Sequence, residues 1–251
     1  MTVVEHLEEL RYRLVVCFGA VAVCVIVAYI FYGPIRDLLL APLDNSGSIG
    51  GTQVCPPPPG TPPTDCEGRE LFNPGIVGPF MVRMRVSAFG GLVMAAPIWL
   101  YQLWRFITPG LMPREKRMAI PFVASSLVLF GLGAWVAFAI MPTAIGFLLS
   151  FLQPGEQQFI TTAEYLGFVM KMLLGFGVAF EFPLVLVFLG AVGVIGSASL
   201  RRWRRYAFFL AFVVAAVATP GGDPVSMLAL AAPLYVLYEA SILVIRYIMK
   251  R

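Results

Sequence analysis

The chain alternates long apolar runs with short polar segments, and this alternation predicts a helical membrane protein. An α-helix needs about 20 apolar residues to cross the hydrocarbon core of a bilayer. Runs of about this length, with one shorter than the rest, occur six times. The sequence therefore predicts an all-α, polytopic protein with six transmembrane helices at Leu14–Phe31, Arg85–Trp104, Ala119–Met141, Tyr165–Ile195, Tyr206–Thr219 and Val225–Ile245.

The fifth run, Tyr206–Thr219, is the short one. At 1.5 Å per residue its helix reaches about 21 Å, which is less than the roughly 30 Å of the hydrocarbon core. We therefore expect this helix to thin the bilayer locally or to be covered by its neighbours.

Prolines lie in or beside several of the runs. A proline inside a helix removes a backbone hydrogen bond and can kink the helix. Kinked helices do not pack as parallel rods, so we expect a concave bundle. The prolines concerned are Pro97, Pro121, Pro142, Pro183, Pro220 and Pro233.

Positive charge is distributed unevenly between the two sides that six spans create. Cytoplasmic segments of membrane proteins are enriched in Lys and Arg. The distribution predicts that both chain ends are cytoplasmic, with Lys171 inside the fourth span. The predicted cytoplasmic side holds Arg11, Arg13, Arg105, Arg114, Lys116, Arg117, Arg201, Arg202, Arg204, Arg205, Arg246, Lys250 and Arg251, and the other side holds Arg36, Arg69, Arg83 and Arg85.

Composition favours a single membrane domain over residues 1–251. Apolar residues make up 59% of the chain and charged residues only 13%, whereas soluble domains contain about a quarter charged residues. The longest polar stretch, residues 44–75, is rich in Pro and Gly and is predicted to be an extracytoplasmic loop. The basic residues form short clusters between apolar runs, which indicates membrane topology and not nucleic-acid binding.

Two cysteines, Cys55 and Cys66, bracket the proline-rich sequence CPPPPGTPPTDC in this loop. An oxidising exterior permits a disulfide between them, which would pin the loop. The alternative is two free thiols in a disordered insertion. Alkylation of both thiols in unreduced membranes would exclude the bridge.

The segment before the first run reads TVVEHLEELRYRL and predicts an amphipathic helix over residues 1–13. Leu7, Leu10 and Leu14 recur at spacings of three and four, so they form one apolar stripe. We expect this helix to lie on the cytoplasmic surface of the membrane and to continue into the first span.

The acids of this segment, Glu8 and Glu9, have two possible roles. They can pair within the helix, Glu9 with Arg13 and Glu8 with Arg11, as residues three or four apart commonly do. Alternatively, they can be offered to a cationic ligand, because a carboxylate takes a guanidinium through two parallel charge-assisted hydrogen bonds. The residues alone do not decide between the two.

The next predicted cytoplasmic segment reads WRFITPGLMPREKR, and Glu115 is its only acid. Its position in the first turn of the third span would complement the helix dipole, which is one explanation for an acid there. The other explanation is again a carboxylate that binds a guanidinium.

Two acids, Glu181 and Glu239, lie within apolar runs. Ionisable groups in hydrocarbon are costly and usually face the bundle interior or serve a function. Glu181 follows GFGVAF, in which Gly175 and Gly177 permit close helix approach. Together with Lys171, these acids could form the ion path of a secondary transporter, or they could only pair helices in a structural scaffold.

Metal, cofactor and catalytic chemistry are not expected. His6 is the only histidine, so a site with several histidine ligands is excluded. The sequence has no nucleotide-binding loop, no HExxH and no GxSxG, so an intramembrane enzyme lacks a recognisable nucleophile and base. The two halves show no evident inverted repeat, which weakens the transporter hypothesis.

Several segments together resemble the TatC family, the multi-spanning subunits of the twin-arginine protein translocase. HLEELRYRL is similar to the family's HLxELRxRL, and APIWLYQLWRFITPGLMPREKR, FGVAFEFPLVLVFL and ATPGGDPVSM follow in family order and spacing. The resemblance covers nearly the whole chain. The cysteine-containing insertion in the first loop departs from shorter members.

The resemblance implies a receptor for folded proteins that carry a signal peptide with paired arginines. It assigns signal-peptide binding to the N-terminal segment and the first cytoplasmic loop, with TatA and TatB as single-span partners and the proton-motive force as the energy source. The residues that match by position are Glu9, Arg11, Glu115 and Phe106 on the receptor face, with Glu8 less regularly acidic in the family, Glu181 in the membrane, and Asp223 with Thr219 after the fifth span.

Overall fold

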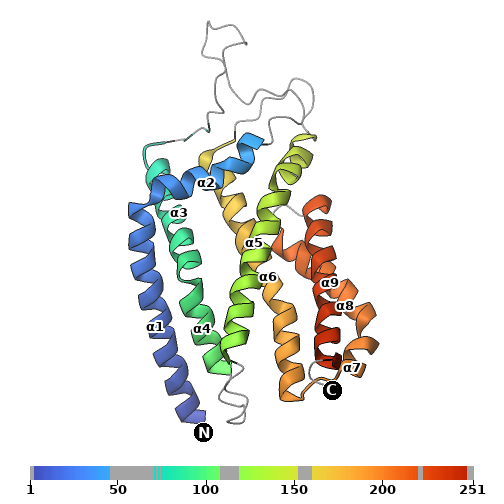
Figure 1. Ribbon diagram of the computed structural model, residues 1–251. Coiled ribbons are helices and arrows are strands. Elements are labelled where there is room, and N and C mark those ends of the chain that lie inside the picture. Colours follow the sequence, from blue (N-terminus) through green and yellow to red (C-terminus); the bar gives the residue numbers. More distant parts are fainter. Residues whose placement is uncertain are drawn as a thin grey trace, which may run out of the picture.

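The fold is built from helices throughout the part of the chain that the structure describes (Figure 1). The computed structural model describes residues 3–45, 71, 73, 75–107, 119–151, 160–219 and 223–247. Within these residues the helices are α1 (Val3–Ile30), α2 (Tyr32–Asn45), α3 (Gly78–Met94), α4 (Ala96–Ile107), α5 (Ala119–Leu149), α6 (Thr162–Val192), α7 (Ser197–Arg202), α8 (Arg204–Ala218) and α9 (Pro224–Tyr247).

Four helices, α1, α5, α6 and α9, are each long and apolar enough to cross a membrane. The bent pair α3 and α4 makes a fifth candidate if it is counted as one span. α8 is as short as the sequence predicts, with 15 residues, and does not reach the length of a full span. The helical membrane class is confirmed, whereas the count of six spans depends on α8 and stays a prediction, as does the concave shape.

The second predicted span, Arg85–Trp104, is two helices and not one. α3 ends at Met94, and α4 continues from Ala96 at an angle of 53°. The break coincides with Pro97, which has no backbone N–H to donate to the preceding turn. In contrast, Pro142 and Pro183 lie inside helices that continue past them, so α5 runs beyond its predicted end.

α1 is one helix from Val3 to Ile30, so residues 1–13 and the first apolar run are not separate elements. Its 28 residues correspond to about 42 Å, which exceeds the roughly 30 Å of the hydrocarbon core. Part of α1 must therefore extend beyond the core. Leu7 and Leu14 of the predicted stripe are exposed, and their contact with a membrane surface stays a prediction.

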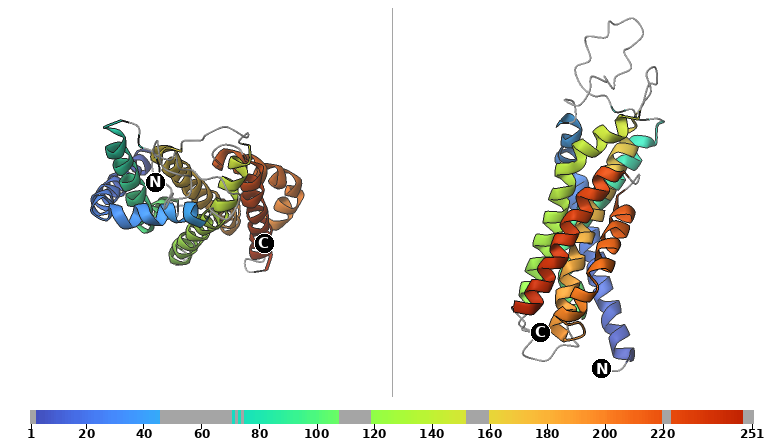
Figure 2. Two further views of the ribbon diagram at one scale, coloured as in Figure 1. Left: turned by 90° about the horizontal axis from the view of Figure 1, so that it is seen from above. Right: turned by 90° about the vertical axis from the view of Figure 1, so that its right-hand side faces the viewer.

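α2 was not predicted, because it is a 14-residue helix without a full apolar run. It begins directly after α1 and crosses the end of the bundle (Figures 1 and 2). The predicted loop over residues 44–75 therefore starts later than expected, after Asn45. Most of that loop, including Cys55 and Cys66, lies outside the described residues.

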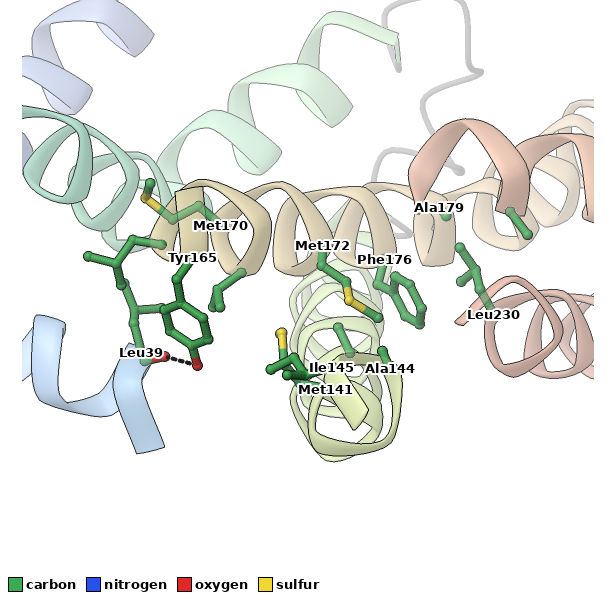
Figure 3. Packing of buried hydrophobic residues seen from close by; sticks show 14 of the residues in the cluster. Leu39, Met141, Ala144, Ile145, Tyr165, Met170, Met172, Phe176, Ala179 and Leu230 are labelled. Carbon is green, nitrogen blue, oxygen red and sulfur yellow. Dashed lines mark hydrogen bonds between the residues drawn. The ribbon is translucent and has the colours of Figure 1, made fainter. Parts of the chain in front are cut away.

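The main core lies where α6 packs against α5 (Figure 3). Met172 and Phe176 of α6 are fully buried and belong to one cluster with Met141 of α5. At the edge of this cluster the Tyr165 hydroxyl donates to the Leu39 carbonyl at 3.2 Å, which ties α6 to α2. Among the long helices, α6 has the largest buried share. Half of the residues in its most apolar stretch are buried inside the protein, whereas the share is 11% for α1.

Glycines let three helices of this core approach closely. A Cβ added at Gly133 would lie 2.6 Å from the Phe176 carbonyl oxygen, and one added at Gly175 would lie 2.6 Å from the Ala218 carbonyl oxygen. Because both obstacles are backbone atoms, a larger residue could not be accommodated by a side-chain movement. α6 is therefore fixed between α5 and α8.

The start of α1 and the end of α9 lie at the same end of the molecule (Figures 1 and 2). α2 and the start of α3 lie at the other end. An even number of crossings places both chain ends on one side of a membrane, so this arrangement is compatible with the predicted topology. Which side is cytoplasmic stays a prediction.

Candidate functional site

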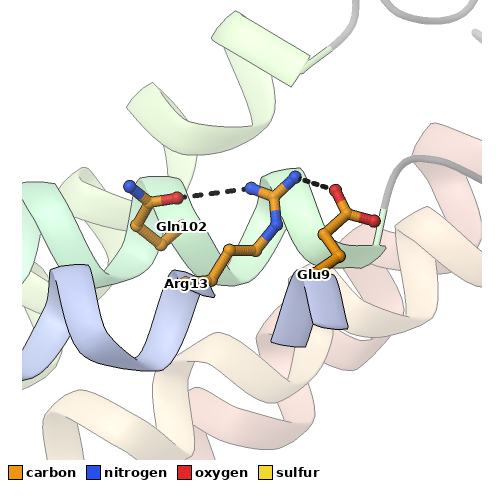
Figure 4. Close-up of polar contacts among 3 residues, drawn as sticks. All are labelled: Glu9, Arg13 and Gln102. Atoms are coloured by element: carbon orange, nitrogen blue, oxygen red, sulfur yellow. Dashed lines mark hydrogen bonds and ion pairs between the residues drawn. The ribbon is translucent and has the colours of Figure 1, made fainter. Parts of the chain in front are cut away.

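The N-terminal part of α1 lies beside the last turns of α4. Nη1 of Arg13 donates to Oε1 of Gln102 at 3.3 Å (Figure 4). Nearer the chain start, the His6 ring stacks on the Phe106 ring with a centroid distance of 4.5 Å. The two segments to which the family resemblance assigns signal-peptide binding therefore meet, at least as far as Ile107, where α4 ends.

Glu9 is held by Arg13 one turn further along α1. Nη2 of Arg13 donates to Oε1 of Glu9 in an ion pair (Figure 4). Arg13 is only 8% exposed, so its guanidinium is largely removed from water. Since ionised groups are seldom buried without a partner, Glu9 and Gln102 together account for the position of this arginine.

The other oxygen of Glu9, Oε2, is buried and has no hydrogen-bond partner among the described residues. The hydrogen bond from Arg13 holds the pKa of Glu9 below its ordinary value. Glu9 therefore stays charged and offers one unused acceptor at the meeting point of α1 and α4.

Of the two ion pairs that the sequence allows within the N-terminal helix, the structure contains one. The Glu9–Arg13 pair is confirmed. No ion pair joins Glu8 and Arg11 in the described part of the chain, and both residues are exposed. Their side chains are therefore available at the surface next to Glu9, and their role in binding stays a prediction.

Phe106 is half-buried and Glu115 lies outside the described residues. Sequence reasoning missed two neighbours of the site, His6 and Gln102. No local pattern could have found Gln102, because it lies 89 positions from Arg13 along the chain.

Glu181 belongs to a second polar cluster, deeper in the bundle. The Ser126 hydroxyl donates to Oε2 of Glu181 and accepts a hydrogen bond from Nε1 of Trp104 at 3.0 Å. Ser126 and Trp104 are buried, with exposed fractions of 0% and 2%. This cluster joins α4, α5 and α6. Oε1 of Glu181 is buried without a partner among the described residues.

Glu239 has a different environment from Glu181. Its Oε2 accepts a hydrogen bond from Nη2 of Arg204 at 2.6 Å, which connects α9 to the start of α8. Both side chains are partly exposed. Pairing of helices, one of the two hypotheses for these acids, describes Glu239 well.

The three ionisable groups of the transporter hypothesis do not form a chain. Glu181 bonds to Ser126, Glu239 bonds to Arg204, and Lys171 lines a groove beside α6. No hydrogen bond or ion pair joins any two of them within the residues that the structure describes. The described contacts therefore do not connect these three groups to one another.

Asp223 and Thr219 flank the junction of α8 and α9. Oδ2 of Asp223 accepts a hydrogen bond from the Ser226 backbone N–H at 2.7 Å, as a helix N-cap does. The Thr219 hydroxyl donates to the Ala215 carbonyl at 2.8 Å. Both residues are buried. Their observed contacts are local and structural, and their contact with partner helices stays a prediction.

Over the described ranges, no group of three or more Cys, His, Asp or Glu residues could hold a metal ion. The polar groups instead gather at helix contacts, and three carboxylates, Glu9, Glu181 and Asp223, each keep one buried oxygen without a partner among the described residues. The fold and these sites define a multi-pass helical membrane protein with a polar surface built by α1 and α4 at one end.

Comparison with known proteins assigns the family. The family model described as "Sec-independent protein translocase protein (TatC)" matches residues 5–233. The chain is 35% identical over 245 residues to the Sec-independent protein translocase protein TatC of Escherichia coli, which covers 97% of this chain and 88% of that protein. The chain therefore belongs to the TatC family.

A longer relative and a solved structure support the same family assignment. Identity to the TatC protein of Frankia casuarinae is 41% over 244 residues, but the chain spans only 65% of that relative's length. A crystal structure of a twin-arginine translocase receptor, TatC, superposes with a TM-score of 0.75 at 34% identity, covering 98% of this chain and 100% of that one. The fold is therefore that of this family over almost the entire chain.

Proposed function

We propose that the protein is the receptor and core subunit of the twin-arginine translocase. In this role it binds the twin-arginine signal peptide of folded proteins and, with TatA and TatB, drives their export across the cell membrane. The observation that carries the proposal is the unpaired, buried Oε2 of Glu9 at the contact of α1 with α4. Membership of the TatC family supports it.

The paired arginines dock on carboxylates of the α1 and α4 surface. Oε2 of Glu9 accepts one charge-assisted hydrogen bond. Glu115, in the segment that follows α4, supplies the second carboxylate, and Glu8 lies exposed next to the site. The stacked rings of His6 and Phe106 offer an aromatic face to a guanidinium plane.

The orientation follows from the charges and from the ends of the chain. The excess of Lys and Arg on the side of α4's end makes that side cytoplasmic. Both chain ends are then cytoplasmic, the protein is a single membrane domain with α8 as the sixth, short crossing, and the α2 end faces outward. With this orientation, the α1 and α4 surface faces newly made cargo.

The membrane half receives the apolar stretch of the signal peptide and the partner helices. Glu181 supplies a polar group to a partner helix or to water, and Asp223 with Thr219 marks the outer junction near the partners. The short α8 thins the bilayer where TatA gathers. No covalent bond is made or broken and no cofactor is needed, because the proton-motive force supplies the energy within an oligomeric complex.

A direct binding experiment tests this function. The purified full chain in lipid nanodiscs is titrated with a fluorescent twin-arginine signal peptide and with the same peptide carrying two lysines in place of the arginines. We expect binding of the first peptide and loss of most of it for the second. Equal binding of both peptides would contradict the proposal, and ion-coupled uptake by the chain alone in liposomes would support a transporter instead.

Charge reversal at the predicted second carboxylate extends the test. Glu115→Lys is expected to abolish photocrosslinking of the signal peptide, because a lysine there repels the arginines. Asp37→Lys is the matched control, since Asp37 is an exposed acid of α2 at the other end of the molecule. Undiminished crosslinking of Glu115→Lys would remove that residue from the site.

A further inference from the structure

A groove follows α6 on the side where α3 and α8 flank it. A cavity of about 880 Å³ lies between α3, α6 and the end of α5, and one of about 900 Å³ lies between α6 and α8. Lys171 and Leu174 line both cavities, so the two adjoin across α6. We call this combined feature the α6 groove. Each half has the size of a small-molecule site.

The walls of the α6 groove are apolar, but two cations enter it. Arg85 of α3 and Lys171 of α6 line the same cavity, and both side chains are exposed. Neither has an ion pair or hydrogen bond with any described residue. Two unpartnered cations beside apolar walls are costly in a bilayer unless an anion neutralises them.

The one acid of the groove, Glu164, is already engaged. Its Oε2 accepts hydrogen bonds from the Thr161 hydroxyl at 2.9 Å and from the Thr161 backbone N–H at 3.3 Å, within the cap of α6. It makes no ion pair with Arg85 or Lys171. The groove therefore carries an excess of one positive charge, which a single negative charge balances.

Both cations lie about two to three turns from the start of their helices. Arg85 follows the start of α3 by about 10 Å along the helix axis, and Lys171 follows the start of α6 by about 14 Å. A 31-residue α6 measures about 46 Å and exceeds the hydrocarbon core by about 16 Å. If this excess is shared between the two ends, Lys171 lies a few Å inside the core boundary, within the reach of a long side chain toward phosphate groups. Arg85 lines the same cavity as Lys171.

We propose that the α6 groove binds an anionic phospholipid of the leaflet at the α2 end of the molecule. The phosphodiester lies between Arg85 and Lys171, and the acyl chains lie along Leu174 and the apolar walls toward α8. Charge complementarity selects this occupant. A free phosphate ion would satisfy the cations but leave the apolar walls uncovered, and a neutral lipid would cover the walls but leave the net charge unbalanced.

Native mass spectrometry of the purified full chain tests the site. Delipidated protein is titrated with phosphatidylglycerol and with phosphatidylcholine of the same acyl composition. We expect one phosphatidylglycerol per chain at concentrations at least about tenfold below those needed for phosphatidylcholine, with no displacement by millimolar inorganic phosphate. Equal binding of the two lipids, or displacement by phosphate, would overturn the proposal.

Variants then locate the bound lipid. Arg85→Gln combined with Lys171→Gln is expected to weaken phosphatidylglycerol binding about tenfold while phosphatidylcholine binding is unchanged. Arg36→Gln is the control, because Arg36 is a partly exposed arginine of α2 at the same end that pairs with Asp37 and does not line the groove. An unchanged affinity in the double variant, or an equal loss in the control, would refute the assignment.

A variant that fills part of the α6 groove tests its apolar walls without changing any charged residue. A Cβ added at Gly167 meets no atom within 4 Å, although Gly167 lines the groove. Gly167→Phe should therefore fold normally, as its thermal unfolding will show, and reduce phosphatidylglycerol binding at least about fivefold. Gly131→Phe, at an equally open glycine of α5, should not. If Gly167→Phe loses signal-peptide binding and keeps the lipid, the groove belongs to the peptide and the proposal fails.

Discussion

Two carboxylates, Glu9 and Glu181, have the same hydrogen-bonding pattern but different neighbours. Each has one oxygen bonded to a neighbouring side chain and one oxygen buried without a partner in the described part of the chain. Each cluster includes a residue of α4, Gln102 for Glu9 and Trp104 for Glu181. α4 therefore links a polar site at the end of the molecule to one within the bundle.

The difference lies in the bonded partner. Glu9 is paired with a guanidinium, which stabilises its charge, whereas the only bonded partner of Glu181 among the described residues is the hydroxyl of Ser126. A charged carboxylate with a spare acceptor suits a cationic ligand. A carboxylate without a cationic partner among its described neighbours suits a group that brings its own proton or charge. The two sites are thus suited to different contacts, a cationic ligand at Glu9 and a polar group that brings its own proton or charge at Glu181.

Of the changes that test this difference between the two sites, neutralising Glu9 should have the largest effect, a loss of signal-peptide affinity. Glu9→Gln keeps the shape but removes the charge, and a hydrogen bond to a charged group contributes about 1.5–3 kcal/mol. We expect signal-peptide affinity to fall about ten- to a hundredfold, measured by fluorescence titration. Glu8→Gln, the exposed neighbour, should change affinity less than about threefold. Equal losses would show that the buried oxygen of Glu9 has no special role.

Removing the hydroxyl of Ser126 examines the deeper site. Ser126→Ala leaves both Oε2 of Glu181 and the Trp104 indole N–H without a partner, at a cost of about 1–3 kcal/mol. We expect a lower thermal unfolding temperature and a shift in Trp104 fluorescence. Ser125→Ala is the control, because no hydrogen bond from Ser125 is found in the described structure. An unchanged Trp104 spectrum would mean that the three residues are not coupled.

Arg13→Lys separates charge from geometry at the first site. Lysine keeps the positive charge but cannot contact Glu9 and Gln102 through one planar fork. We expect a loss of about 1 kcal/mol in stability, the usual net value of one hydrogen bond, measured by thermal unfolding. Arg11→Lys, at an exposed position, should have no effect, and an equal effect of both changes would contradict the role given to Arg13.

The smallest effect is expected at Glu239, the carboxylate with a conventional surface partner. Arg204→Gln breaks an ion pair whose side chains are 49% and 29% exposed, and such pairs contribute about 0–1 kcal/mol. Thermal unfolding in low and high salt should show a small loss only at low salt. A loss as large as that of Ser126→Ala would mean that Glu239 is a third site comparable to the first two.

Local patterns in the sequence predicted the helical membrane class and the acidic residue of each site, but not the residues that bond to it from other helices. The apolar runs predicted the long helices, and the spacing of four predicted the Glu9–Arg13 pair. Contacts between distant segments were beyond such patterns, because Arg13 and Gln102 or Ser126 and Glu181 come together only through packing of helices. α2 was missed because it has no long apolar run. Pro97 was predicted to permit a kink, but its 53° bend between α3 and α4 was not, because hydropathy carries no information on helix direction.

The glycine contacts at Gly133 and Gly175 have a consequence for the route of the cargo. Close backbone contacts join α5 to α6 at Gly133 and α6 to α8 at Gly175, so these three helices cannot separate without losing those contacts. A folded domain of 100 residues has a radius of gyration of about 13 Å, far more than these helices can open without losing their contacts. Under the proposed function, we therefore expect a folded passenger to pass along the rim of the protein, through lipid or an assembly of partners, and not through the chain as a pore.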